Sequence, residues 1–566
     1  MNIISPAVTN CNLTDFEALY KTFSWDSVYQ NFSWQQTGKI NIVYEAVDRH
    51  LPALANKTAF IFQGEKESQS LTYLDLSMQT NRFGNVLKKH GLKKQDRVFV
   101  FMPRRLETYI ALLGAIKAGA IVGPLFEAFM TEAVKDRLLD SQAKFLVTTP
   151  ELLPRVPLAE LPDLGKIIVV GDDVIPGTLN YFAEMANVED TMDIEWADFE
   201  DGYILHYTSG STGKPKGVLH AHRAMVGHYQ TGKWVLDLRP DDIYWCTADP
   251  GWVTGTAYGI FAPLLNGVTC LILGGRFNAQ RWYSAIEQHK VTVWYSAPTA
   301  FRMLMSAGED VAKSFDLSSL RHVLSVGEPL NPEVVYWGLH ALGQRIHDTW
   351  WMTETGMQLI CNLPSLPIKP GSMGKPLPGI YAAIIDEHGN ELPPNTIGNL
   401  AIKTPWISMM SAIWNNEQKY QEYFRIKPWY LSGDVAYKDE DGYFWFQGRN
   451  DDIINTSGER VGPFEIESKL IEHPAVAEAG VIGKPDSLRG EIIKAFIALR
   501  KGFIPSEELH EEIKNFIKTS LAAHMVPKEI QFIEKLPKTR SGKIMRRVLK
   551  AMELGLPLGD LSTAED

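Results

Sequence analysis

Residues 207–217 read Tyr-Thr-Ser-Gly-Ser-Thr-Gly-Lys-Pro-Lys-Gly, and Val218-Leu-His220 follows directly. The preceding residues 203–207 are predicted to form a strand, and residues 221–236 are predicted to form a helix. Glycines let backbone N–H groups turn toward an anion, while hydroxyl and lysine side chains add donors and positive charge. The stretch therefore predicts a loop that holds a phosphate.

Two other interpretations of this stretch are weaker. The P-loop of ATPases needs Gly-x-x-x-x-Gly-Lys-Ser/Thr, but Gly210 and Gly213 are only three residues apart and Pro215 follows Lys214. A flexible Ser/Gly linker has a similar composition, but a linker rarely lies between a buried strand and a helix. The phosphate-loop hypothesis is therefore retained.

Length, charge and cysteine spacing set the broad class. A chain of 566 residues is long for one hydrophobic core, so two or more domains are expected. The net charge of −11 argues against nucleic acid or an acidic membrane as the main partner. Four widely spaced cysteines, with no C-x-x-C pair, favour reduced thiols. The N-terminus has no basic start followed by an apolar run, so we expect no secretion signal and a cytoplasmic location.

The order of predicted strands and helices indicates an α/β protein. Alternation up to about residue 379 predicts parallel sheets covered on both faces, arranged as two doubly wound subdomains. A small β-rich subdomain is expected at about 380–445. We expect residues 1–450 to form a large N-terminal domain and residues 451–566 to form a small, mobile α+β C-terminal domain.

Further motifs follow the phosphate loop in a fixed order. Gly327-Glu-Pro329 and residues 347–356 (His-Asp-Thr-Trp-Trp-Met-Thr-Glu-Thr-Gly) each follow a predicted strand. Residues 430–434 end in the carboxylate of Asp434, which is placed at a loop, and Gly448-Arg449 comes shortly after. Residues 537–543 end in Lys543 near the C-terminus. With Thr-Ser-Gly-Ser-Thr-Gly-x-Pro-Lys-Gly, this order resembles the acyl-adenylate-forming enzymes: acyl-CoA synthetases, peptide-synthetase adenylation domains and luciferases.

The resemblance implies formation of an acyl-AMP from a carboxylic acid and ATP, with Mg²⁺, and transfer of the acyl group to coenzyme A. Such chemistry depends on positioning and charge neutralisation. Lys543, Glu354 and Thr353 are the implied catalytic residues, with Glu354 holding Mg²⁺. The implied ATP/AMP-binding residues are Thr208, Ser209, Gly210, Ser211, Thr212, Gly213, Lys214, Lys216, Gly327, Glu328, Pro329, Asp348, Thr349, Trp350, Trp351, Thr353, Asp434, Arg449 and Arg460.

The second half-reaction implies a movement of the C-terminal domain. In the family this domain swings about a hinge just after the arginine, which places the hinge at Asp451. The swing brings Gly458 and Arg460 toward CoA, and Lys518 falls where relatives carry a basic residue for a CoA phosphate. Ile471, His473 and Val476 fall where some members bind a structural magnesium. For His473, an ordinary surface histidine is the favoured interpretation.

The acid is inferred from the tryptophan pair at residues 350–351. In acetyl-CoA synthetases an indole closes the carboxylate pocket, so the resemblance implies an acetate–CoA ligase with Trp351 as the closing wall. The other implied pocket residues are Trp252, Val253, Thr254 and Val326. A methylene is worth about 1–3 kcal/mol of discrimination, so propionate is expected as a slower substrate. Activation of propionate, or of another short or cyclic acid, stays open as the alternative.

Three rival classes are less well supported. A peptide-synthetase module would need an acidic residue for the amino group and a carrier domain, for which few residues follow Lys543. A luciferase-like monooxygenase does not fit a tight pocket, and a catalytically inactive nucleotide-binding regulator would not retain Glu354, Asp434 and Lys543. The resemblance also implies a protein acetyltransferase and deacetylase as partners, because acetylation of Lys543 would remove its charge.

Overall fold

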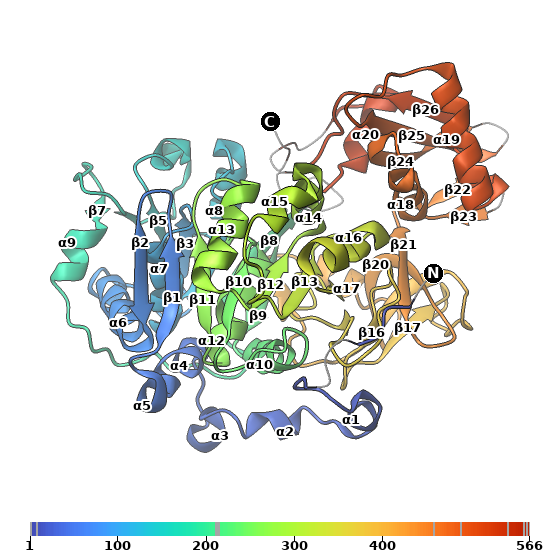
Figure 1. Cartoon of the computed structure of the whole chain (residues 1–566). Helices are drawn as coiled ribbons and strands as arrows, with labels where there is room; N and C mark the ends of the chain where they lie inside the picture. The colour runs from blue at the N-terminus through green and yellow to red at the C-terminus, as the bar shows by residue number, and fades with distance from the viewer. Residues whose placement is uncertain are drawn as a thin grey trace.

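The computed structural model describes residues 3–6, 10–209, 215–456, 459–486, 489–539, 543–558, 561 and 564. A large N-terminal part contains two mainly parallel sheets and a smaller antiparallel sheet, and a separate C-terminal part lies at one end beside α16 and β21 (Figure 1). The predicted fold class, an α/β protein with a large N-terminal and a small C-terminal domain, is confirmed.

The first large sheet carries the phosphate loop. Strands β8, β4, β3, β5, β6 and β7 run parallel, and β9 and β19 add an antiparallel edge. Strand β3 is Arg-Val-Phe-Val-Phe, the near-continuous apolar run expected where helices cover both faces. In spatial order the strands are β19 (Ala412–Ile413), β9 (Pro215–Ala221), β8 (Gly202–Ser209), β4 (Ile121–Leu125), β3 (Arg97–Phe101), β5 (Phe145–Thr148), β6 (Lys166–Val169) and β7 (Leu179–Asn180).

The second large sheet draws its strands from both sides of the phosphate loop. Its parallel centre runs from β14 to β1, and β15, β16 and β2 are antiparallel at the edges. Because β1 and β2 come from residues before the loop, the two sheets do not coincide with two consecutive blocks of sequence. The spatial order is β16 (Lys375–Pro376), β15 (Ile360–Cys361), β14 (Ile346–Trp350), β13 (His322–Val326), β12 (Val293–Ser296), β10 (Ile243–Cys246), β11 (Thr269–Leu273), β1 (Thr58–Gln63) and β2 (Ser68–Thr72).

Helices cover these sheets and a helical segment wraps around them. Helix α6 starts at a capping box in which Thr72 and Asp75 satisfy each other's backbone N–H groups. The N-terminal wrap is held by long-range contacts such as Trp25 Nε1 donating to the Gly379 carbonyl at 3.4 Å. The α-helices before the antiparallel sheet are α1 (Phe16–Thr22), α2 (Asp26–Tyr29), α3 (Trp34–Thr37), α4 (Ile42–Ala46), α5 (Leu51–Leu54), α6 (Tyr73–Lys89), α7 (Leu106–Lys117), α8 (Thr131–Ser141), α9 (Tyr181–Ala186), α10 (Ala224–Trp234), α11 (Val253–Thr256), α12 (Ala262–Leu265), α13 (Ala279–His289), α14 (Pro298–Ala307), α15 (Glu309–Lys313) and α16 (Pro332–Trp337).

Short helical turns of other types connect several of these elements. The 3₁₀ turns are η1 (Asp48–His50), η2 (Leu153–Arg155), η3 (Leu158–Glu160) and, in the C-terminal part, η6 (Ala523–Met525). The π segments are η4 (Ala257–Phe261) and η5 (Gly338–Leu342). Segment η4 continues directly from α11, so the two form one helical stretch.

The smaller antiparallel sheet ends in the strands that lead to the C-terminal domain. Its order is β17 (Ala382–Ile385), β18 (Gly398–Lys403), β20 (Trp429–Lys438) and β21 (Phe444–Arg449), with α17 (Glu417–Glu422) beside it. Strand β20 pairs with β21 so that Asp434 lies opposite Arg449.

The C-terminal domain is built on a sheet of its own. The strands are β22 (Ile454–Thr456), β23 (Glu459–Val461), β24 (Val476–Asp486), β25 (Gly490–Leu499) and β26 (Glu529–Phe532), and the helices are α18 (Pro463–Glu472), α19 (Glu507–Ser520) and α20 (Arg546–Leu554). Helix α18 packs against β21, and Phe446 meets Phe464 with ring centroids 5.7 Å apart. Asn331 Nδ2 also donates to Ser468 Oγ at 2.8 Å, so the domain docks on the N-terminal part in this arrangement.

The prediction for the element that follows the phosphate loop is wrong. The phosphate loop joins two antiparallel strands, β8 and β9, and not a strand and a helix. Residues 215–221 form β9, which pairs with both β8 and β19, and the helix begins only at Ala224. No helix within the described ranges is long and apolar enough to cross a membrane.

Candidate active site

The carboxylate of Asp434 lies where the second large sheet meets the antiparallel sheet. Trp350 Nε1, at the end of β14, donates to Asp434 Oδ2 at 2.8 Å, and Arg449 Nη1 donates to Asp434 Oδ1 at 2.8 Å. The negative charge of Asp434 raises the pKa of Arg449 above its ordinary value. Asp434 was expected in a loop but lies within β20, because that strand continues to Lys438. Each carboxylate oxygen accepts more than one hydrogen bond, so ribose hydroxyls fit here.

Two of the predicted nucleotide-binding residues carry a buried polar atom without a partner. Thr208 Oγ1 and Asp348 Oδ1 are buried and have no hydrogen-bond partner among the described residues. Burial raises the pKa of Asp348 to about 8. Orphaned polar groups are rare in a protein interior, and their presence fits a nucleotide whose polar edges would satisfy them. Asp348 and Thr349 lie within β14 and do not follow it, which corrects the expected position of this motif.

The Gly327–Pro329 turn follows β13 as predicted. Gly327 has φ of +91°, a conformation that glycine adopts without a Cβ penalty. Glu328 accepts from Arg302 Nη2 at 2.8 Å and from Thr299 Oγ1 at 2.8 Å. The side chain of Glu328 therefore anchors the turn and leaves the backbone to face a ligand.

Glu354 is paired with a lysine of the phosphate hairpin. Lys216 Nζ lies 2.7 Å from Glu354 Oε1, and the hydroxyl of Tyr423 donates to the same oxygen at 2.9 Å. Burial acts to raise the pKa of Glu354, but the charge and hydrogen bond of Lys216 and the bond from Tyr423 lower it overall. The carboxylate is thus held ionised. A single ionised carboxylate together with substrate phosphates is a usual environment for Mg²⁺, so Glu354 fits the implied ion.

Lys543 reaches this site from the C-terminal domain. A tight turn fixes its backbone, since Lys543 N donates to Thr539 Oγ1 at 3.0 Å and Thr539 N donates to the Lys543 carbonyl at 2.8 Å. The residue is exposed, yet protein atoms crowd its ammonium group. This desolvation and the positive charge of Arg449 lower the pKa of Lys543, while Asp434 acts in the opposite direction. The ammonium is therefore close enough to the Asp434–Arg449 pair to feel the charge of both groups.

Three predicted acyl-pocket residues contribute to the main hydrophobic core of the N-terminal part. Trp351 and Val326 are buried in this core, Val253 packs against it, and the ring of Tyr258 meets the Trp351 indole edge-on at 4.9 Å. Thr254 lies on the same helical stretch as Tyr258. Trp252 packs in a different cluster, against Phe126 and Phe129, at 5.5 and 5.9 Å.

Other predicted site residues lie far along the chain from the acyl-pocket residues or outside the described part of the structure. Ser209 ends β8, but its side chain and residues 210–214 and 458 are outside the described part, as is the side chain of Arg460 in β23. Lys518 is exposed on the last turn of α19, and Asp451 is exposed in a turn after Arg449. These positions stay predictions for CoA binding and for the hinge.

The three positions predicted for a structural magnesium include a buried histidine. His473 was favoured as a surface residue, but it is only 3% exposed. His473 is the C-cap residue of α18. Its ring packs edge-on against the Phe516 ring with centroids 5.2 Å apart, and its Nε2 lies 3.4 Å from Glu512 Oε1. Ile471 lies in α18 and Val476 begins β24. In the described ranges, no group of three or more His, Cys, Asp or Glu side chains could hold a metal.

Two buried histidines hold the loop after β14, and the sequence interpretation did not identify them. His220 Nε2 donates to the Thr353 carbonyl at 2.7 Å, and His228 Nε2 donates to the Gly356 carbonyl at 2.8 Å. Gly356 has φ of +70°, and a Cβ there would lie 2.0 Å from the Ser408 carbonyl oxygen. The imidazoles and this close approach fix the loop that carries Glu354. In the sequence His220 only ends the stretch that follows the phosphate loop, and His228 only lies in the predicted helix, so neither has a motif of its own.

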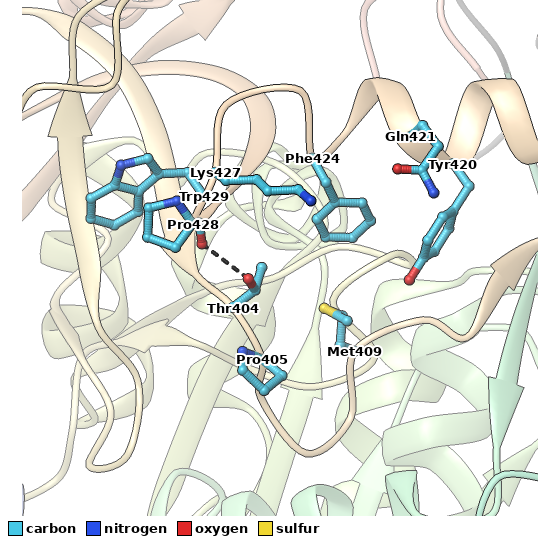
Figure 2. Close-up of a pocket in the computed structure, with 9 residues that line it drawn as sticks. All are labelled: Thr404, Pro405, Met409, Tyr420, Gln421, Phe424, Lys427, Pro428 and Trp429. Carbon is cyan, nitrogen blue, oxygen red and sulfur yellow. Dashed lines mark hydrogen bonds between the residues drawn. The ribbon is translucent and has the colours of Figure 1, made fainter.

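A separate pocket lies beside α17, which contributes Tyr420 and Gln421 to its lining. It has a volume of about 330 Å³ and is lined by Thr404, Pro405, Met409, Tyr420, Gln421, Phe424, Lys427, Pro428 and Trp429 (Figure 2). Thr404 Oγ1 donates to the Pro428 carbonyl at 3.0 Å across it. None of the predicted site residues lines this pocket.

Comparison with known families agrees with the geometry. Residues 47–414 match the model of the AMP-binding enzyme family, and residues 465–543 match the AMP-binding enzyme C-terminal domain. The chain belongs to the AMP-binding enzyme family. The chain is 65% identical over 560 residues to an acetyl-coenzyme A synthetase of Bacillus subtilis, covering 98% of each protein. It is 42% identical to the acetyl-coenzyme A synthetase of Methanothrix thermoacetophila, covering 93% of this chain and 85% of the relative.

Solved structures of AMP-binding enzymes have the same fold. An anthranilate CoA ligase in complex with anthranoyl-AMP superposes with a TM-score of 0.84 at 33% identity, covering 92% of this chain and 98% of the other. A Brucella canis acyl-CoA synthetase superposes with a TM-score of 0.75 at 35% identity, covering 95% and 99%. The motif order in this AMP-binding enzyme therefore corresponds to the family fold over nearly the whole chain.

The buried histidines make stability depend on pH. Burial lowers the pKa of His228 to about 3, while an unfolded histidine titrates near about 6.5. The unfolded state therefore binds one more proton between these values, and stability is present above about pH 6.5 and is lost as the pH falls. His228→Gln, which keeps an N–H for the Gly356 carbonyl, is expected to reduce the slope of unfolding free energy against pH by up to about 1.4 kcal/mol per pH unit.

Urea denaturation between pH 7 and pH 4.5 measures this slope. The exposed His388→Gln variant is the matched control. A slope identical in wild type and His228→Gln would contradict the buried neutral state of His228.

Proposed function

We propose that this protein is an AMP-forming acetate–CoA ligase, which converts acetate, ATP and CoA to acetyl-CoA, AMP and pyrophosphate through an acetyl-adenylate. The observation that carries the proposal is the end of β14. There Trp350 Nε1 donates to Asp434, Asp348 Oδ1 is buried without a partner among the described residues, and the next residue, Trp351, is a buried indole. The strong similarity to curated acetyl-coenzyme A synthetases supports the same acid.

In the first step an acetate oxygen attacks the α-phosphorus of ATP and pyrophosphate leaves. Asp434, Arg449 and Trp350 hold the ribose, and Asp348 and the Gly327–Pro329 turn face the adenine. Glu354 would hold Mg²⁺, which would supply positive charge to the phosphates when bound. Thr353 and Lys216 lie beside Glu354 and add phosphate contacts, and the ammonium of Lys543 stabilises the charge that develops between the two anions.

In the second step the CoA thiol attacks the acetyl carbonyl and AMP leaves. The C-terminal domain, residues 451–566, turns about Asp451 and exchanges Lys543 for Gly458 and Arg460, with Lys518 near a CoA phosphate. The turn would break the hydrogen bond between Asn331 and Ser468 and change the packing of Phe464 against Phe446. The free thiols of the four cysteines support a cytoplasmic location as part of this proposal.

Lys543→Ala tests whether Lys543 acts in adenylation and not in thioester formation. The variant is expected to lose adenylation by about 10²–10³-fold, because a charge aimed at the transition state is removed. Transfer of the acetyl group from supplied acetyl-AMP to CoA should stay near the wild-type rate. Pyrophosphate release and thioester formation are measured separately, and an equal loss of both steps would exclude the assigned role.

Trp351→Gly tests the acyl wall. Wild type is expected to have its highest kcat/KM with acetate, and propionate should be about 10-fold poorer or more. The glycine variant should shift the optimum toward longer acids, since the indole no longer fills the end of the pocket. Pyrophosphate release is measured with acids from acetate to hexanoate and with benzoate. A wild-type preference for a larger or cyclic acid would contradict acetate as the substrate while leaving adenylation intact.

Acetylation of Lys543 by a protein acetyltransferase, reversed by a deacetylase, is a regulatory part of the proposal. Acetylation removes the ammonium charge, so stoichiometric acetylation should abolish acetate-dependent pyrophosphate release. Thioester formation from supplied acetyl-AMP is expected to continue. Full pyrophosphate release by protein shown by mass spectrometry to be acetylated at Lys543 would rule this out.

A further inference from the structure

A phenol beneath the acyl wall contacts three side chains at once. Tyr295, on β12, is fully buried, and its hydroxyl lies 3.2 Å from Trp351 Nε1. The same oxygen lies 2.7 Å from Thr349 Oγ1 and 3.0 Å from Gln358 Nε2. Tyr295 therefore joins the strand that carries the nucleotide contacts to the indole that closes the pocket.

The direction of each hydrogen bond follows from the available protons. Trp351 Nε1 and Gln358 Nε2 can only donate, so the Tyr295 oxygen accepts both bonds. Thr349 Oγ1 donates its own proton to the Ser325 carbonyl at 2.7 Å, and so it accepts from Tyr295. One donated and two accepted bonds fill the capacity of a phenol. No bond in this set can be lost without leaving a buried polar group unpaired.

The other side of the indole is fixed as well. The Tyr258 ring meets the Trp351 ring at 72°. The Tyr258 hydroxyl accepts from Gln358 N at 2.7 Å and lies 2.8 Å from Thr231 Oγ1. Since Thr231 gives its proton to the Gly227 carbonyl at 2.7 Å, Tyr258 donates to Thr231. Gln358 thus connects both residues that hold the indole.

We propose that Tyr295 is a specificity-determining positioning residue, which holds the Trp351 indole at the depth that excludes acids longer than acetate. The inference rests on the proposed function and assigns part of its selectivity to a residue behind the pocket wall. The Tyr295 hydroxyl is the hydrogen-bond acceptor of the indole N–H. The ring can leave this orientation only by burying an unpaired donor, which is costly.

Tyr295→Phe removes this acceptor and keeps the ring. The ratio of kcat/KM for acetate to kcat/KM for propionate is expected to fall by about 10-fold, because the released indole opens the end of the pocket. Most of the change should be a loss with acetate, while the rate with propionate or butyrate stays the same or rises. The KM for ATP should stay within about threefold of wild type, since Thr349 keeps its bond to Ser325.

Two further sets of variants make the test specific. Tyr283→Phe removes another buried hydroxyl, one without a hydrogen-bond partner in the described part of the chain, and should leave the acid ratio unchanged. Trp351→Phe keeps an aromatic wall but has no N–H, so adding Tyr295→Phe to it should cause no further change in the ratio. Should Tyr295→Phe fail to fold, Trp351→Phe alone must still lower the ratio by about 10-fold.

The outcomes separate this inference from the proposed function. If wild type prefers acetate but Tyr295→Phe keeps the wild-type acid ratio, the inference is overturned alone. An equal loss with all acids, or a change confined to the KM for ATP, also overturns it, because the phenol would then act on the fold or the nucleotide. The inference is also overturned if Tyr295→Phe still changes the ratio of kcat/KM for acetate to kcat/KM for propionate in the Trp351→Phe background. If wild type prefers a larger acid, the proposed function itself fails.

Discussion

The arrangement of the site depends on the hydrogen bonds that the carboxylate of Asp434 accepts. This carboxylate accepts from Trp350 of the second large sheet and from Arg449 of the antiparallel sheet, both at 2.8 Å. Its charge also acts on Lys543 from the C-terminal domain. Three parts of the fold therefore converge on one group. Because a buried carboxylate without partners is costly, the two sheets must keep their relative positions for these hydrogen bonds to form.

The site gathers positively charged side chains, although the chain as a whole carries a net charge of −11. Lys216, Arg449 and Lys543 supply positive charge where phosphates are expected, and each is balanced or flanked by a carboxylate. Beneath them the supports are uncharged, namely the neutral imidazoles of His220 and His228. A neutral support is an advantage, because a buried cation below Glu354 would compete with the ion and the phosphates for that carboxylate.

Much of the site was predictable from sequence because its residues lie in short local motifs. The order of the motifs from Thr208 to Lys543 predicted the nucleotide contacts, and both residues of the observed Asp434–Arg449 pair were among them. The support of these residues was not predictable. Tyr295 and His220 are ordinary core residues in sequence, and their importance comes from contacts with residues more than fifty positions away.

The fold was predictable to a similar extent. Alternating strands and helices indicated parallel sheets, but the pairing of β1 with β11 is non-local and leaves no sequence signal. The second strand of the phosphate hairpin was missed because its first residues belong to the Gly- and Lys-rich loop motif, and the helix was expected from residue 221. In both cases the register comes from burial against distant strands, which the local pattern does not contain.

The transfer of oxygen from acetate to AMP tests the central claim most directly. With acetate labelled by ¹⁸O in both carboxylate positions, an acetyl-adenylate requires that one labelled oxygen end in the phosphate of AMP and the other stay in acetyl-CoA. Mass spectrometry of the AMP should therefore find one ¹⁸O per molecule. Unlabelled AMP, or label found in pyrophosphate or inorganic phosphate, would contradict the account.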